Sequence, residues 1–282
     1  MNAASPLPPI LDAAALAALL QEREGPDLHL LDVRWSLDGS KGVHTYREGH
    51  LPGAVYLDLP TELSDPTRVG RGRHPLPTPE GFAATLRRAG VTTGSRVVAY
   101  DDTSGTAAAR LVWMLRVIGH DAALLDGGLA AWEGELSTED PAVAEGDVPA
   151  RPWPDTRIAS VEEVAAGTAQ VVDARAAERY RGDVEPLDPR AGHVPGALNL
   201  PFAGNLGEDG RFLEPAALRQ RFADHGLDLE AETVVYCGSG VTAAHEVLAM
   251  DHAGIAGVRL FPGSWSQWSA EESRPVATGP RP

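Results

Sequence analysis

The chain repeats itself in four blocks, and this duplication restricts its fold more than any other feature of the sequence. "LLDVRW" returns as "VVDARA", "GHLPGA" as "GHVPGA", "RVVAYDDTSG" as "TVVYCGSG", and "GGLAAW" as "GSWSQW". The blocks keep their order, and they recur after 136 to 143 residues. A period of this length is far longer than the repeat of a solenoid, so we expect each copy to be a complete domain.

A linker is expected between the two copies. Residues 137–158 are rich in proline and acidic residues and show no clear periodicity, which is typical of a connecting segment. We place the boundary near residue 145. The prediction is therefore one domain over residues 1–145 and a second over residues 146–282.

Short apolar runs alternate with helix-like stretches in each copy. The runs lie at 28–33, 54–59, 96–100 and 122–126 in the first copy, and at 171–174, 197–201, 233–237 and 258–262 in the second. Continuous apolar runs without strict alternation are typical of parallel strands that are covered on both faces. The fold class predicted is α/β, with two tandem domains that each have a mostly parallel sheet covered by helices, such as 106–118 and 241–253.

Composition excludes several classes of function. The net charge of −16 disfavours a nucleic acid partner. A single cysteine allows neither an internal disulfide nor a cysteine-rich zinc site. No apolar run is long enough for a membrane span, and the N-terminal apolar stretch reads as a helix with Asp12 in its first turn rather than as a signal peptide. We expect a reduced, soluble, cytoplasmic protein that has no membrane partner, no metal and no organic cofactor.

The single cysteine, Cys237, stands where an apolar strand-like run gives way to a glycine-rich turn and then to a helix. A thiol acts as a nucleophile in its thiolate form, and the start of a helix stabilises an anion. Gly238 and Gly240 allow successive N–H groups to point at one centre, and Ser239 and Thr242 add hydroxyl groups at the rim. The turn is predicted to hold an anion around the sulfur, and an inert buried cysteine is the alternative.

The first copy has Asp101 at the position that corresponds to the cysteine. The same turn without a nucleophile predicts one catalytically inactive domain and one active domain. This asymmetry favours a catalytic Cys237 over an inert one.

These motifs together resemble those of the two-domain rhodanese-type sulfurtransferases. The resemblance rests on the tandem copies, the "DVR" and "DAR" strands, the "GHxPGA" motifs, the paired "GGLAAW" and "GSWSQW" segments and the "CGSGVTA" loop. It covers nearly the whole chain. It implies that Cys237 takes up a sulfane sulfur as a persulfide and passes that sulfur to a nucleophilic acceptor.

The resemblance also bears on the sulfur donor. A neutral Gly-Ser-Gly-Val-Thr turn is similar to that of the members that use 3-mercaptopyruvate, whereas members that prefer thiosulfate carry basic residues there. In those members arginines of the matching segment bind the donor, which implies this role for Arg181 and Arg190. A guanidinium can grip a carboxylate through two hydrogen bonds, and a surface salt bridge is the alternative. Arg175 has a twin, Arg34, in the inactive copy, so we expect it to be structural and to pair with a carboxylate.

The implied reaction has two half-reactions. The Cys237 thiolate attacks the donor sulfur, Ser239 helps to protonate the pyruvate enolate, and a thiol, cyanide or a thioredoxin-like protein then removes the sulfur. The predicted catalytic residues are Cys237 and Ser239, and the predicted substrate-binding residues are Arg181, Arg190, Gly238, Gly240, Val241 and Thr242.

A proton relay is a further implication of the resemblance. Some members of the family pass a proton from the loop serine through a histidine and a carboxylate, and His74 in "RGRHPLP" resembles that histidine. Pro60 stands near the usual acidic position, so Asp58 or Glu62 would have to serve. A surface histidine is the alternative.

Three other functions compete with this prediction. A thiosulfate sulfurtransferase has the same fold and differs in its donor. A non-catalytic rhodanese-type module for binding or sulfur sensing usually lacks the cysteine that this chain keeps. A phosphatase of this fold needs an arginine six residues after the cysteine, where this chain has Ala243.

Overall fold

The computed structural model describes residues 5–22 and 27–282, and the chain divides into two compact units. The first unit contains Met1–Ser64 and Pro77–Trp153. The second contains Pro154–Pro282 together with Asp65–Leu76, so a segment from the first half of the sequence is part of the second unit. The domain boundary that we expect near residue 145 is a statement about which parts of the chain fold independently. It stays a prediction.

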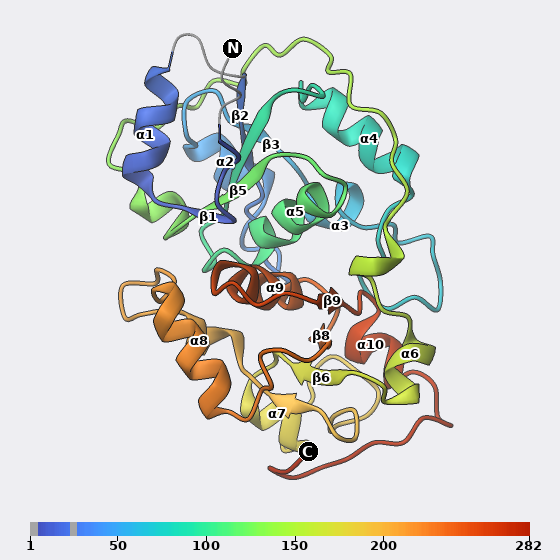
Figure 1. Ribbon diagram of the computed structural model, residues 1–282. Helices are drawn as coiled ribbons and strands as arrows, with labels where there is room; N and C mark the ends of the chain where they lie inside the picture. Colours follow the sequence, from blue (N-terminus) through green and yellow to red (C-terminus); the bar gives the residue numbers. More distant parts are fainter. Residues whose placement is uncertain (1–4, 23–26) are drawn as a thin grey trace. The chain divides into compact units, whose positions relative to one another are not determined.

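The first unit has a parallel sheet with the strand order β1-β5-β4-β2-β3. Figure 1 labels β1, β2, β3 and β5 of this sheet. Its strands are β1 (Ile10–Leu11), β2 (Leu28–Asp32), β3 (Val55–Tyr56), β4 (Arg96–Tyr100) and β5 (Ala122–Leu125). The helices beside this sheet are α1 (Ala13–Gln21), α2 (Val43–Glu48), α3 (Leu59–Glu62), α4 (Pro79–Arg88), α5 (Thr106–Val117) and the 3-10 turn η1 (Gly128–Ala131). The predicted apolar runs contain β2 to β5. The sequence does not predict β1, because a strand of two residues is too short to show a run of apolar residues.

The second unit repeats this plan with the strand order β7-β6-β8-β9, again all parallel. Its strands are β6 (Gln170–Asp173), β7 (Leu198–Asn199), β8 (Thr233–Tyr236) and β9 (Val258–Leu260). The flanking helices are α6 (Val161–Ala166), α7 (Ala177–Arg181), α8 (Pro215–Asp224), α9 (Thr242–His252) and α10 (Ser264–Trp268), with the 3-10 turns η2 (Asp155–Arg157) and η3 (Phe202–Asn205). The predicted fold class, two tandem α/β domains with mostly parallel sheets, is confirmed.

The helix at the start of the chain begins one residue later than predicted. Asp12 is the residue before α1, and its carboxylate accepts a hydrogen bond from the N–H of Ala15 at 2.7 Å. An aspartate at this cap position satisfies one of the N–H groups that a helix start leaves unpaired.

The strands β4 and β8 lie inside their sheets and are fully buried. Tyr100 at the end of β4 is in register with Asp32, and Tyr236 at the end of β8 is in register with Asp173. The residue that follows each strand therefore lies at the carboxyl edge of its sheet, where ligands of such folds bind. In the first unit that residue is Asp101, and in the second it is Cys237.

Structural contacts that recur in both units support the duplication. Arg34 pairs with Asp32 at 2.8 Å, and Arg175 pairs with Asp173 at 2.6 Å, all with buried side chains. The expected structural role of Arg175 is thereby confirmed. The two histidines of the "GHxPGA" motifs are also equivalent, since each stacks on a tyrosine ring and places Nδ1 within 2.8 Å of that tyrosine's carbonyl oxygen.

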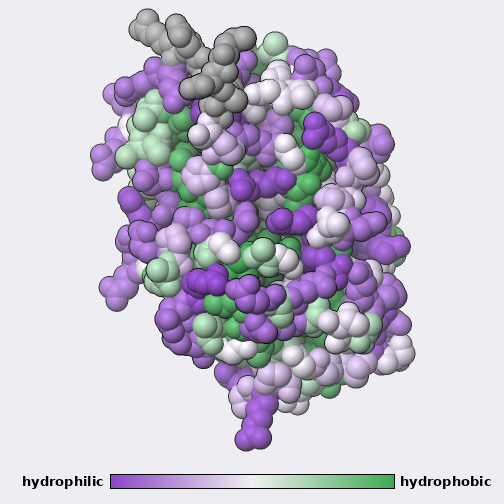
Figure 2. Space-filling view, in the orientation of Figure 1, coloured by the Kyte–Doolittle hydropathy of each residue, from purple (hydrophilic) through white to green (hydrophobic). Residues whose placement is uncertain are grey.

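Figure 2 shows a face on which hydrophilic side chains dominate, in keeping with the 23% of charged residues. In the part of the chain that the structure describes, no helix has the length and the apolar character that crossing a membrane requires.

Candidate functional site

The turn after β8 holds Cys237 as a buried free thiol with 2% of its surface exposed. Its Sγ accepts a hydrogen bond from the N–H of Gly240 at 3.2 Å. Gly240 has a φ of +78°, which favours glycine and lets the chain turn its N–H back toward the sulfur. Because α9 begins at Thr242, the sulfur also lies at the start of a helix. Both features stabilise a thiolate.

The first turn of α10 fixes the backbone of the cysteine loop. The N–H of Trp265 donates to the carbonyl of Cys237, and the N–H of Ser266 donates to the carbonyl of Gly238, both at 2.9 Å. The hydroxyl of Ser264 accepts a hydrogen bond from the N–H of Cys237 at 3.2 Å. The loop is thus held on both sides of the sulfur, which keeps its N–H groups in place.

The structure brings His74 to the loop. Its Nδ1 lies 2.8 Å from Oγ of Ser239, whose residue is 7% exposed. This contact lies within the second unit, because the segment 65–76 belongs to that unit. The geometry is the one that proton exchange between Ser239 and His74 needs.

Two guanidinium groups reach the loop, and sequence analysis missed both. A methyl group on Gly238 would lie 3.0 Å from Nη2 of Arg73 and 3.3 Å from Nη1 of Arg179. Among the described residues, neither of these two nitrogens has a hydrogen-bond partner. Two guanidinium groups beside the cysteine loop have the chemistry to bind a small anion. The sequence held one signal for this, since Arg73 directly precedes His74.

A row of alternating charges orients these arginines. Arg179 donates to Glu185 at 2.6 Å and to Asp188 at 3.3 Å, and Arg73 forms an ion pair with Asp188. Glu185 also pairs with Arg175 at 3.2 Å, which links the row to the buried end of β6. Burial raises the pKa of Asp188, and Glu185 raises it further, while the arginines lower it. Since Asp188 and Glu185 are each only 3% exposed, they hold both arginines from the protein side.

The contacts of Arg181 and Arg190 do not support the donor-binding role predicted for them. Arg181 is paired with Asp183 at 2.7 Å and is 37% exposed. It lies two residues after Arg179 on α7, and residues two apart on a helix do not share a face. The Arg190 guanidinium instead donates to main-chain carbonyls of the C-terminal segment, those of Trp268, Ser269, Glu271, Glu272 and Arg274. Through these contacts Arg190 holds in place the end of α10 and the segment that follows it.

Asp101 fills the corresponding turn of the first unit. Its fully buried carboxylate accepts hydrogen bonds of 2.8 to 3.0 Å from the N–H groups of Thr103, Gly105, Ala107 and Ala108. Burial raises the pKa of Asp101, against the four N–H groups, which lower it. The turn of the first unit therefore has N–H groups arranged around an anion, and the Asp101 carboxylate occupies that position.

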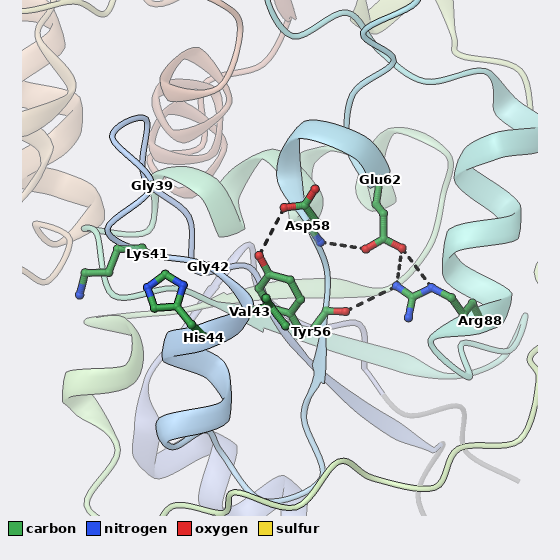
Figure 3. A pocket seen from close by; sticks show the side chains of 9 residues that line it. All are labelled: Gly39, Lys41, Gly42, Val43, His44, Tyr56, Asp58, Glu62 and Arg88. Atoms are coloured by element: carbon green, nitrogen blue, oxygen red, sulfur yellow. Dashed lines mark hydrogen bonds and ion pairs between the residues drawn. The ribbon is translucent and has the colours of Figure 1, made fainter.

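A separate hollow of about 510 Å³ lies on the first unit (Figure 3). Its charged side chains have partners: Asp58 accepts a hydrogen bond from Tyr56 at 3.4 Å, Arg88 pairs with Glu62, and Lys41 pairs with Asp102 at 2.6 Å. Asp58 and Glu62, the carboxylates considered for a relay, thus have partners of their own within the first unit. Over residues 5–22 and 27–282, no cluster of three or more histidine, cysteine, aspartate or glutamate side chains is arranged to hold a metal ion.

Comparison with known proteins gives consistent matches. The rhodanese-like domain family matches residues 15–135 and 160–271. The chain is 44% identical over 278 residues to SseB of Mycobacterium tuberculosis, whose name proposes thiosulfate sulfurtransferase activity, with 96% of this chain and 97% of the relative covered. It is 46% identical over 282 residues to a Pseudomonas aeruginosa protein whose name proposes 3-mercaptopyruvate sulfurtransferase activity, with 96% and 98% covered.

A solved structure agrees with these relatives. The crystal structure of the 3-mercaptopyruvate sulfurtransferase SseA from Escherichia coli matches with a TM-score of 0.80 and 34% identity. The match covers 92% of this chain and 100% of the SseA chain.

Proposed function

The chain belongs to the rhodanese-like family, and on this basis we propose that it moves sulfur from 3-mercaptopyruvate to a thiol acceptor through a persulfide on Cys237. It is a sulfurtransferase, like the relatives that match almost its whole length. The single observation that carries the proposal of an anionic sulfur donor is the pair of guanidinium groups, from Arg73 and Arg179, beside a cysteine at the start of a helix.

The first half-reaction uses the arginines to place the donor. The carboxylate and keto oxygen of 3-mercaptopyruvate bind to Arg73 and Arg179, which directs the donor sulfur to Cys237. The thiolate attacks that sulfur, an S–S bond forms, and the C–S bond breaks with its electron pair left on carbon. The product is the enolate of pyruvate, whose developing charge the two cations stabilise.

Ser239 and His74 complete this half-reaction. The hydroxyl of Ser239 donates a proton to the enolate, and His74, with Nδ1 at 2.8 Å, returns a proton to the serine oxygen. The outer sulfur of the persulfide then lies toward the N–H groups of residues 238–242. Those groups and the start of α9 stabilise it as an anion.

The second half-reaction regenerates the enzyme. An acceptor thiolate attacks the outer sulfur, the S–S bond breaks, and Cys237 leaves as a thiolate. Because the donor product departs before the acceptor reacts, steady-state kinetics with varied donor and acceptor are expected to be ping-pong. A small thiol or a thioredoxin-like protein serves as the acceptor.

Mass spectrometry of the intact protein tests the proposal. Wild type mixed with 3-mercaptopyruvate is expected to gain one sulfur atom, and Cys237→Ser is expected to gain none. Arg179→Ala is expected to raise KM for the donor and also to lower kcat, since it removes a group that binds the donor and stabilises the developing enolate. A wild-type protein that never gains sulfur, or a gain that persists in Cys237→Ser, would show the proposal to be wrong.

Thiosulfate is the second candidate donor. Its doubly charged head also suits two guanidinium groups, and the Mycobacterium tuberculosis relative has a name that refers to it. The ratio of kcat/KM for the two donors at equal ionic strength decides between them. We expect 3-mercaptopyruvate to be the better donor, because the turn after Cys237 carries no cation of its own.

A further inference from the structure

The segment 65–76 ends in contacts with the cysteine loop, but its tip faces solvent. Residues 68–71, with the sequence Arg-Val-Gly-Arg, are all exposed, and Val69 is 93% exposed. Among the described residues, Arg71 has no ion-pair partner. The tip is a small cationic and apolar surface on a chain whose net charge is −16. We call residues 68–71 the basic tip.

The basic tip stands on a base that is fixed at both ends. The N–H of Asp65 donates to the carbonyl of Pro75 at 3.0 Å, and the guanidinium of Arg68 donates to the carbonyl of Leu76 at the same distance. The N–H of Arg73 donates to Oγ of Ser266 at 3.0 Å. The tip is therefore presented from a closed loop rather than from a free strand.

Gly72 lets the loop approach the cysteine site closely. A methyl group at this position would lie 2.5 Å from the carbonyl oxygen of Gly263, and φ of Gly72 is +88°. Arg71 is two residues from Arg73 and three from His74, which is about 10 Å of extended chain at most. A molecule bound to the basic tip is thus within reach of the sulfur on Cys237.

We propose that the basic tip is the docking surface for a protein acceptor that carries its reactive thiol beside acidic side chains. The inference rests on the proposed function, because it concerns which acceptor takes the sulfur. A second exposed apolar side chain, Leu187, precedes the Asp188 that pairs with Arg73, so both partners of this ion pair have an exposed apolar residue near them in the sequence.

The charges of the basic tip and of the rest of the surface indicate which kind of partner binds at the tip. An acidic partner is repelled by most of this surface, so it gains its attraction only where the cations are, which fixes its orientation toward the site. A basic partner would be drawn to the rest of the chain instead. A small thiol is too short to touch residues 68–71 while it reacts. Nucleic acid binding needs many neutralised phosphates, and two exposed arginines on a chain of charge −16 supply few.

The test compares acceptors on enzyme that has first been loaded with sulfur. The acceptors are a synthetic peptide with a cysteine between aspartates, the same peptide with lysines in their place, a reduced acidic thioredoxin, and 2-mercaptoethanol. The variants are Arg71→Glu and Arg68→Glu/Arg71→Glu. The matched control is Arg211→Glu/Arg219→Glu, which reverses two other exposed arginines of the second unit and changes the net charge equally.

The double variant is expected to lose about tenfold or more in kcat/KM for the acidic peptide and for thioredoxin, and to change less than twofold for 2-mercaptoethanol. The preference of wild type for the acidic peptide is expected to fade as salt is raised. The rate at which donor loads Cys237 reports whether the base of the loop is intact, and it is expected to stay unchanged in Arg71→Glu.

Equal acceptor kinetics in the tip variants and the control would overturn the inference, as would inhibition of the wild type by an RNA oligonucleotide but not by a thiol-free acidic peptide. Failure of the wild type to load sulfur at all would instead contradict the proposed function.

Discussion

The pH dependence of stability is expected to be set in part by one buried carboxylate, Glu246 in the middle of α9. Its side chain is fully buried and accepts a hydrogen bond from Asn205 at 2.6 Å. Arg221 forms a long ion pair with it, with Nη1 at 3.8 Å from Oε1. Burial raises the pKa of Glu246 to about 7, against the opposing effects of Arg221 and Asn205.

The sign of the effect follows from linkage. The ordinary pKa of this group is 4.5, so between pH 4.5 and about 7 the folded state binds more protons than the unfolded state. Stability is therefore fully present below the unfolded pKa and falls as the pH rises through the folded one. A shift from 4.5 to about 7 corresponds to about 3 kcal/mol in total, of which about 2.5 kcal/mol falls between pH 5 and pH 8.

Glu246→Gln replaces the titratable carboxyl group with an amide of nearly the same shape, whose oxygen can keep the hydrogen bond from Asn205. The free energy of unfolding, measured in urea by circular dichroism from pH 5 to pH 8, is compared with that of wild type. The variant is expected to gain about 2.5 kcal/mol on wild type across this range. Glu208→Gln, at an exposed position of the same unit, serves as the control. Its free energy of unfolding is expected to differ from that of wild type by the same amount at every pH. A difference between Glu246→Gln and wild type that does not change with pH would refute the reasoning.

Other substitutions test the positions of single residues. Asp101→Ala leaves four buried N–H groups without an acceptor and is expected to lower the free energy of unfolding in urea by about 3 kcal/mol; an unchanged value would mean that another group accepts these hydrogen bonds. Arg190→Ala is expected to lower the thermal midpoint by about 5 °C with an unchanged KM for the donor, and a raised KM at a constant midpoint would restore its donor-binding role. Gly72→Ala pushes a methyl group against Gly263 and is expected to slow the loading of Cys237 about tenfold or more in stopped-flow assays; wild-type loading would show that the close approach is dispensable.

The duplication made most of the fold predictable. Parallel strands buried on both faces leave continuous apolar runs, and the two copies confirm each other block by block, so β2 to β9 can be predicted from the sequence. The position of Cys237 after an inner strand follows from the same pattern. The turn around Cys237 could also be predicted, because its glycines and the helix that follows are adjacent to the cysteine in the sequence.

The arginines of the site could not be assigned in this way. Arg179 and Arg181 flank the buried Tyr180, and which of them faces the loop depends on the rotation of a five-residue helix. Arg73 reaches the loop because the segment 65–76 packs with the second unit, and no local pattern reports such a long-range contact. Glu246 lies in a helix whose neighbours are apolar, and its burial follows from packing against α8 and η3.

Because the segment 65–76 belongs to the second unit, the surroundings of Cys237 are built from both halves of the sequence. A fragment cut at the linker and beginning at residue 154 would keep the nucleophile and lose both His74 and Arg73. The first half of the sequence, which has Asp101 at the position that corresponds to Cys237, therefore still supplies residues that contact the cysteine loop. Changes more than 150 positions upstream of Cys237 can thus alter the surroundings of its sulfur.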